Sequence, residues 1–190
     1  MLLQGKINQI IKFISIMEVF GICFIIGMAF ALQLLWNDLP CPLCLLQRLG
    51  LLGIALGFLL NIRYHVRPSH YAISLLSALF TAFVALRQIA LHISDPIGYG
   101  KAIFGMHMYT WCFIIYMIAI IYLASAISFP WQYQLTKNDT AIVNPRSKLL
   151  GAFSHTAFLL LVILVIANII SVLLECGLSE CPDNPIKYII

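Results

Sequence analysis

Five long apolar segments constrain this chain more than any other feature of its sequence. Each is about as long as the roughly 20 residues that a helix needs to cross the hydrocarbon layer of a bilayer. The chain is 62% hydrophobic and only 9% charged, against about 25% charged residues in soluble domains. We therefore predict an all-α membrane protein, a four-helix transmembrane bundle plus a fifth transmembrane helix. The spans are Phe13–Leu35, Leu43–Ile62, Tyr71–Ile93, Met106–Phe129 and Ala152–Leu174.

Short connections join these spans, so we expect a single domain over residues 1–190 with an outer cysteine-containing tail over 175–190. The first span has one competing interpretation. Lys6 and Lys12 precede an apolar run that contains Ala29-Phe30-Ala31, a pattern similar to a signal peptide with its cleavage site. The run continues to Leu35, longer than a typical signal-peptide core, which favours a retained span.

The distribution of charge predicts the orientation of the chain. Alternating spans put one set of basic residues on the same side, and the positive-inside rule makes that side cytoplasmic. The net charge of +4 is therefore explained by the basic residues on the cytoplasmic side of the membrane. We expect contact with a lipid bilayer and none with nucleic acid. The basic set is Lys6, Lys12, Arg63, Arg67, Lys137, Arg146 and Lys148, whereas the opposite side has Lys101, Lys187, Asp38, Asp95, Glu175, Glu180 and Asp183.

A Cys-x-x-Cys motif opens the second span. Pro42 is suited to the first turn of a helix, and a cysteine in that turn faces the positive end of the helix dipole, which favours the thiolate. Arg48 follows Cys44 by four residues, so both project from the same helical face. The sequence thus predicts a redox-capable dithiol, Cys41 and Cys44, at the membrane surface with a cation just below it.

Glycines occupy the opposite side of the same helix. Gly50, Gly53 and Gly57 lie roughly opposite Cys44 and Arg48 at 100° per residue. Small residues let two membrane helices approach closely. We therefore expect this face to pack against a neighbouring helix.

Polar residues end the third span at a depth similar to that of Arg48. Gln88 and His92 share a face there, and clustered polar residues inside a membrane suggest a functional site. Internal hydrogen bonding is the alternative interpretation of both. His107 and Tyr109 match interfacial belt residues, with ligand contact as the alternative. The fifth span has almost no polar residue before Leu174.

A second cysteine pair follows the fifth span. Cys176 and Cys181 then emerge on the same outer side as Cys41 and Cys44, because an even number of crossings lies between the two pairs. Such pairs can exchange electrons through a mixed disulfide. Exchange needs a final acceptor, and a lipid-soluble quinone suits a dithiol at the hydrocarbon boundary, with Arg48 as hydrogen-bond donor to a quinone carbonyl. The remaining cysteines, Cys23 and Cys112, are interpreted as structural.

The segment Cys41-Pro-Leu-Cys44-Leu-Leu-Gln-Arg48, at the outer start of a second span, resembles the DsbB family of bacterial disulfide-forming membrane proteins. The resemblance covers roughly the first 128 residues. It implies that Cys41 and Cys44 are the quinone-reducing pair, that Arg48 is the quinone-side arginine, and that His92, with Gln88, lies near the headgroup. It further implies a multi-pass protein of the bacterial inner membrane, with a cytoplasmic N-terminus and a periplasmic C-terminus. Electrons would pass from a periplasmic thioredoxin-fold oxidase of the DsbA type to ubiquinone or menaquinone.

The chain departs from that family in its second redox pair. Better-known members carry it between the third and fourth helices, where Ser94–Met106 has no cysteine. We expect that loop to form turns or a short amphipathic helix. Our hypothesis is that Cys176 and Cys181 are the relocated exchange pair, and the alternative is a static bridge.

Two further alternatives remain open at the level of sequence. A thiol reductase of the vitamin K epoxide reductase type is also a small helical bundle, but its quinone-side pair lies late in the bundle. The other is a non-enzymatic membrane protein whose four outer cysteines bind a soft metal such as zinc. An oxidising compartment and an intramembrane arginine argue against that second alternative.

Overall fold

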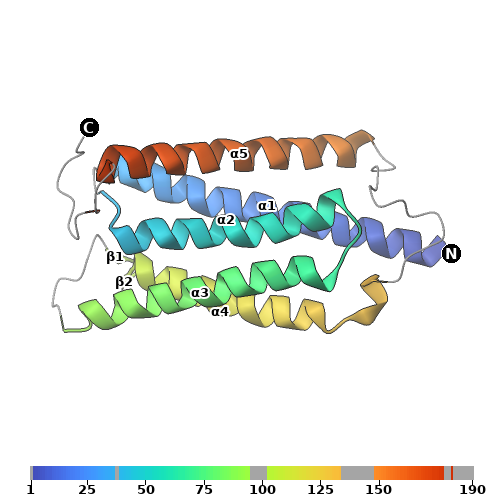
Figure 1. The fold of residues 1–190 in the computed structure, drawn as a ribbon, viewed down its shortest axis with the longest axis horizontal. Helices are drawn as coiled ribbons and strands as arrows, with labels where there is room; N and C mark the ends of the chain where they lie inside the picture. The colour runs from blue at the N-terminus through green and yellow to red at the C-terminus, as the bar shows by residue number, and fades with distance from the viewer. Residues whose placement is uncertain (1, 37–38, 95–101, 134–147, 178–180, 182–190) are drawn as a thin grey trace.

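The computed structural model describes residues 2–36, 39–94, 102–133, 148–177 and 181 of the 190. This part of the chain contains five long helices that run back and forth along one axis (Figure 1). All five are long and apolar enough to cross a membrane, so the predicted all-α membrane fold is confirmed. They are α1 (Leu2–Trp36), α2 (Pro42–Arg63), α3 (Pro68–His92), α4 (Met108–Ile127) and α5 (Lys148–Cys176), with a 3-10 turn η1 (Pro130–Tyr133) after α4.

Two helices extend further than the hydropathy pattern indicates. The first begins at Leu2 rather than near Phe13, since a helix can continue past the bilayer without being apolar. The fifth continues to Cys176. The predicted tail therefore begins later than residue 175, and Glu175 and Cys176 belong to the last turn of a membrane-length helix.

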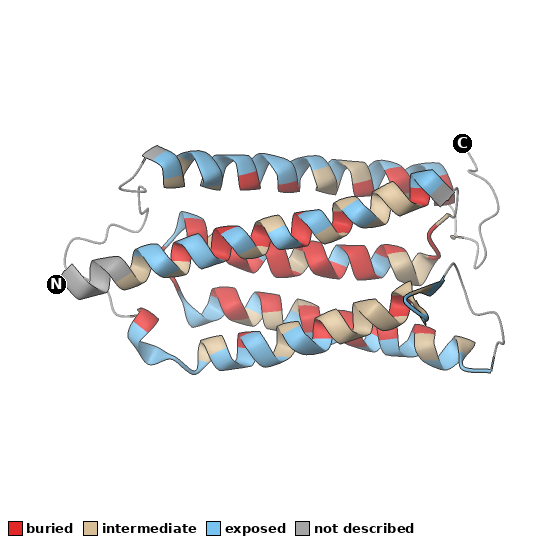
Figure 2. Ribbon diagram, turned by 180° about the vertical axis from the view of Figure 1, so that it is seen from behind, coloured by how far each residue is buried: buried red, intermediate tan, exposed pale blue. Residues whose placement is uncertain are grey.

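The arrangement of the helices places α5 at one side of the bundle. Helix α2 packs between α1 and α3, α4 packs on α3, and α5 packs against α1 and α2. Buried residues line the inner faces, and exposed apolar residues cover much of the outer faces (Figure 2). Outward apolar side chains of this kind are what a helix presents to lipid.

The predicted glycine face packs against α3. A Cβ atom on Gly50 would collide with Thr81, and one on Gly57 would collide with Ser74 and with the carbonyl oxygen of His70. Ser74 also donates a hydrogen bond of 2.8 Å to the carbonyl of Ile54 on α2. Small residues thus let the two helices approach closely, as expected for this pattern.

A small hairpin precedes α4. Strands β1 (Ala102–Ile103) and β2 (Met106–His107) pair antiparallel, and Trp111 donates from Nε1 to the carbonyl of Ile103 at 3.1 Å. The two turn residues, Phe104 and Gly105, both have positive φ, 51° and 80°, as a two-residue type I′ turn requires. The expected turns are therefore present in the described part of the loop, whereas the alternative of a short amphipathic helix is wrong there.

We predict that Gly57→Ala destabilises the protein by about 1–3 kcal/mol, because the added methyl group meets backbone as well as a side chain. Thermal unfolding in detergent micelles measures the effect. Gly21→Ala in α1 is the matched control, since a Cβ atom there has nothing within 4 Å. Equal melting temperatures for the two variants would contradict the close α2–α3 packing.

Candidate functional site

The N-terminus of α2 carries the two cysteines of the Cys-x-x-Cys motif. Cys41 is the N-cap residue and Pro42 occupies the first turn. The Cys41 sulfur accepts a hydrogen bond of 3.2 Å from the backbone N–H of Cys44, which satisfies one of the free N–H groups of the helix start. Both cysteines are free thiols, with Cys41 buried and Cys44 half-buried.

Gln88 of α3 contacts both sulfur atoms. Its side-chain nitrogen donates to Cys41 Sγ at 3.1 Å and to Cys44 Sγ at 3.5 Å, and its side-chain oxygen lies 3.9 Å from Cys44 Sγ, as an acceptor of the thiol. The side chain is fully buried. An amide that both donates and accepts can hydrogen bond a sulfur as thiol or as thiolate.

Two residues that sequence reasoning missed hold Gln88 in place. Gln47 donates from Nε2 to Gln88 Oε1 at 2.7 Å, and the hydroxyl of Tyr116 on α4 donates to the Gln47 carbonyl. Both are buried. A signal for Gln47 was available, since it lies three residues after Cys44, on the neighbouring turn of the same helix.

Arg48 is held against α1. Its Nη1 donates to Gln33 Oε1 at 2.9 Å, its Nη2 donates to the Ala29 carbonyl at 3.4 Å, and its guanidinium lies 4.5 Å from the centre of the Phe30 ring. Only 7% of Arg48 is exposed. A buried cation held by hydrogen bonds and by an aromatic face is oriented by the protein, not by solvent.

A polar seam, formed by Gln33 of α1 with Asn168, Ser171 and Glu175 of α5, continues from Arg48. Gln33 donates from Nε2 to Ser171 Oγ at 3.4 Å. The three α5 residues lie on one helical face, at spacings of three and four, and all are buried. The fifth span is therefore not the nearly apolar helix that we expected on the basis of its hydropathy.

His92, in the last turn of α3, lies against α4. Its ring stacks on Tyr109 with centroids 5.6 Å apart, and Tyr109 stacks on His107 at 5.3 Å. Nδ1–H of His92 donates to the Gln88 carbonyl at 3.0 Å. The predicted belt residues Tyr109 and His107 thus join His92 in a stack of three rings.

The structure therefore brings Gln88 directly to the cysteines, whereas Arg48 and His92 lie next to different helices. Cys112 of α4, interpreted from sequence as structural, interacts electrostatically with both Cys44 and Arg48. The pKa of Cys41, at the helix cap, is raised by its side-chain hydrogen bond with Cys44 and then by burial. This arrangement favours retention of the Cys41 proton.

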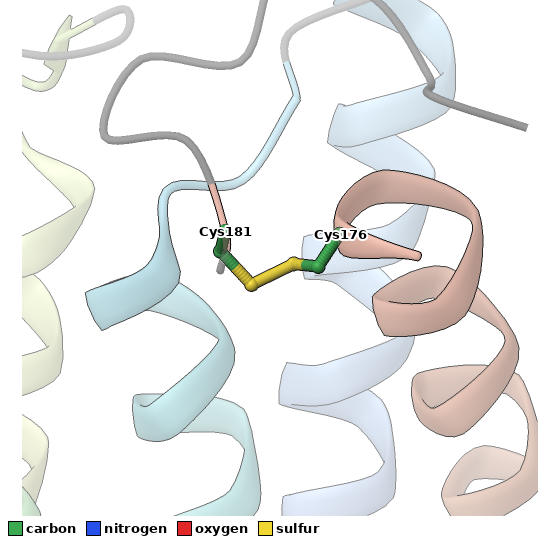
Figure 3. Close-up of a disulfide and its surroundings, with 2 residues drawn as sticks. All are labelled: Cys176 and Cys181. Carbon is green, nitrogen blue, oxygen red and sulfur yellow. A yellow bond between two sulfur atoms is a disulfide. The ribbon is translucent and has the colours of Figure 1, made fainter. Parts of the chain in front are cut away.

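The second cysteine pair forms a disulfide. Cys176 and Cys181 are bonded to each other, with Cα atoms 4.4 Å apart. Figure 3 shows the bond at the end of α5, which lies at the same end of the bundle as the start of α2 (Figures 1 and 3). The expectation that both pairs emerge on one side of the helices agrees with this arrangement.

Residues 12–96 match a family model, that of the disulfide bond formation protein DsbB. This segment is similar to that family. The DsbB match includes Cys41, Cys44, Arg48, Gln88 and His92, and it ends before α4, short of the roughly 128 residues that we expected. The matched family is one of disulfide bond formation. No curated protein and no solved structure matches the chain.

The alternative of a four-cysteine metal site gains no support from this geometry. Among the described residues, no group of three or more His, Cys, Asp or Glu side chains could hold a metal ion. Cys176 and Cys181 are bonded to each other, and the sulfurs of Cys41 and Cys44 share Gln88.

We predict that Gln88→Leu lowers the free energy of unfolding by about 1–3 kcal/mol, because it leaves the buried amide of Gln47 without its acceptor. The double variant Gln47→Leu/Gln88→Leu should recover part of the loss, since both partners are then apolar. Thermal unfolding in detergent of the two single variants and the double variant completes the cycle. Losses that simply add would contradict the pairing of the two amides.

Proposed function

We propose that this protein is a membrane thiol oxidoreductase that reoxidises a periplasmic, thioredoxin-fold dithiol oxidase of the DsbA type and passes the electrons to a membrane quinone. In this proposal the protein lies in the bacterial inner membrane, with its N-terminus in the cytoplasm and its C-terminus in the periplasm. Ubiquinone or menaquinone is the acceptor.

The observation that carries the proposal is the dithiol at the start of α2 inside a segment similar to the DsbB family. Cys41 and Cys44 share the amide of Gln88, and the buried Arg48 lies one turn further along α2. A dithiol that becomes a disulfide gives up two electrons and two protons. A quinone, when bound, accepts two electrons and two protons.

The residues at this end of the bundle fit a quinone. His92, Tyr109 and His107 present stacked planar rings, and Nδ1 of His107 is buried with no hydrogen-bond partner among the described residues. A planar ligand with two carbonyl groups requires surfaces and polar atoms of this kind. Arg48, Gln88 and His92 would hold it, with Arg48 favouring negative charge on its oxygen.

The roles of the protein groups follow from their contacts. Gln88 orients both sulfurs and can hydrogen bond either protonation state of Cys44. Arg48 is held in a fixed position by Gln33 and Phe30, so its charge is in place before the reaction begins. These contacts fit a reaction in which Cys41 and Cys44, one buried and one half-buried, transfer electrons where water has little access.

We assign the exchange with the partner oxidase to Cys176 and Cys181. A partner thiolate attacks their disulfide, a mixed disulfide forms, and the second partner thiol releases it as a reduced tail pair. The reduced pair then reduces a disulfide between Cys41 and Cys44 in the same way. The partner ends oxidised, and two electrons have moved to the start of α2.

Purified protein, ubiquinone and a reduced DsbA-type oxidase should together reduce the quinone, as followed by its ultraviolet absorbance. We predict that Cys44→Ser abolishes this reduction, because a single thiol cannot form the internal disulfide. Arg48→Gln should raise the KM for quinone at least tenfold. Arg63→Gln is the control, since Arg63 has the same charge but is exposed at the other end of α2. Normal activity of Cys44→Ser would contradict the proposal.

The exchange role of the tail predicts a covalent intermediate. Cys181→Ser or Cys176→Ser should leave one tail thiol that accumulates as a mixed disulfide with a partner oxidase carrying a single active-site cysteine. Non-reducing gel electrophoresis and mass spectrometry of the cross-linked peptides identify it. A tail pair that stays oxidised throughout turnover would instead be a static bridge.

A further inference from the structure

Among the described residues, Glu175 is the one acidic residue at the end of the bundle that carries both cysteine pairs. It directly precedes Cys176 in the last turn of α5, and it interacts electrostatically with Arg48 and Cys44 of α2. Only 1% of Glu175 is exposed. Glu175 is distant from Arg48 and Cys44 in the sequence but close to them in space, because α5 packs against α1 and α2.

Both carboxyl oxygens of Glu175 are buried and have no hydrogen-bond partner among the described residues. A buried carboxylate without hydrogen bonds is costly. Within the polar seam, the hydrogen bond between Gln33 and Ser171 does not involve the side chain of Glu175. The carboxyl group is thus available to bind a proton or a transient polar partner. A permanent hydrogen bond to another side chain would prevent such binding.

The charged and titratable groups that act on Glu175 from the elements packed around it can be named. From α2 they are Arg48 and Cys44. The described outer end of α1 contributes the uncharged Gln33, and α5 itself contributes Cys176, which does not titrate while it is in the disulfide. Protonation of the Glu175 carboxyl group is therefore coupled to the charge on Cys44, which belongs to one redox pair. In the sequence, Glu175 directly precedes Cys176, which belongs to the other pair.

We propose that Glu175 is the proton-transfer group for the internal exchange between the tail pair and Cys41/Cys44. This inference rests on the proposed function. The Glu175 carboxylate takes the proton of one reduced tail thiol, and the resulting thiolate attacks Cys41. The Cys41–Cys44 bond breaks, Cys44 leaves as a thiolate, and Glu175 returns the proton to it. The second tail thiol attacks the mixed disulfide, releases Cys41 as a thiol and restores the bond between Cys176 and Cys181.

The test follows thiols directly in quinone-free, fully oxidised protein in detergent. A reduced DsbA-type oxidase is added, the reaction is quenched with acid at millisecond intervals, and mass-tagged maleimide shows which pair is reduced. We expect Glu175→Gln to slow the appearance of reduced Cys41 and Cys44 about a hundredfold at pH 7, a typical loss for proton-transfer groups. Reduction of the tail pair itself should keep its rate.

The pH profile separates proton transfer from a structural role. Without the carboxylate, the exchange depends on spontaneous thiolate formation, so its rate should rise about tenfold per pH unit below the thiol pKa of about 8.5. The wild-type protein should show a flatter profile, and Glu175→Asp should restore much of it. Asn168→Ala is the matched control, since Asn168 is buried on the same face of α5 and its side-chain oxygen has no hydrogen-bond partner in the described part of the chain.

Different results overturn different claims. If Cys41 and Cys44 are reduced equally fast after Cys176→Ser/Cys181→Ser, the tail relay is wrong and the role of Glu175 is wrong with it. If the relay operates but Glu175→Gln keeps the wild-type rate and pH profile, only the role of Glu175 is wrong. A slower exchange with an unchanged pH profile would make Glu175 a counter-charge to Arg48, which also contradicts the inference.

Discussion

The close contact between α2 and α3 is the constraint on which the rest of the structure depends. Gly50 and Gly57 leave no room for a Cβ atom against Thr81 and Ser74. With the helices this close, the amide of Gln88 reaches the sulfurs that the start of α2 presents. A wider spacing would separate donor and sulfur beyond hydrogen-bond distance, so packing along the helices sets the chemistry at their end.

The lipid surroundings explain why so many polar groups of this site bond to one another. Water is absent from the hydrocarbon layer, and an unpaired polar group there is costly. Gln47, Gln88 and Tyr116 link three helices, while Arg48, Gln33 and Ser171 link α2, α1 and α5. Each chain of bonds fixes a helix relative to the cysteines. Glu175 is an exception, because its carboxyl oxygens have no hydrogen-bond partner among the residues that the structure describes.

Sequence reasoning predicted the spans, the glycine face and the place of the Cys-x-x-Cys motif at the start of a helix, because each depends on spacing along one helix. It also singled out Gln88, although without its contact with the sulfurs. It missed Gln47, Gln33 and Ser171, whose significance arises only where different helices meet. The polar face of α5 was not evident from its average hydropathy, because Asn168 and Ser171 lie within an apolar run of the sequence. The predicted ends of the first and fifth spans also differ from the observed helix ends, because hydropathy indicates only the part of a helix inside the bilayer and these helices continue beyond it.

The disulfide at the end of α5 joins residues only five positions apart in the sequence. Linking the chain over so short a distance removes little freedom from the unfolded state, and the loop-entropy relation gives about 2 kcal/mol. Helix α5 is held instead by its packing against α1 and α2. Opening this small ring would therefore leave the helices in place, so the bond can be made and broken repeatedly with little effect on the architecture that carries it.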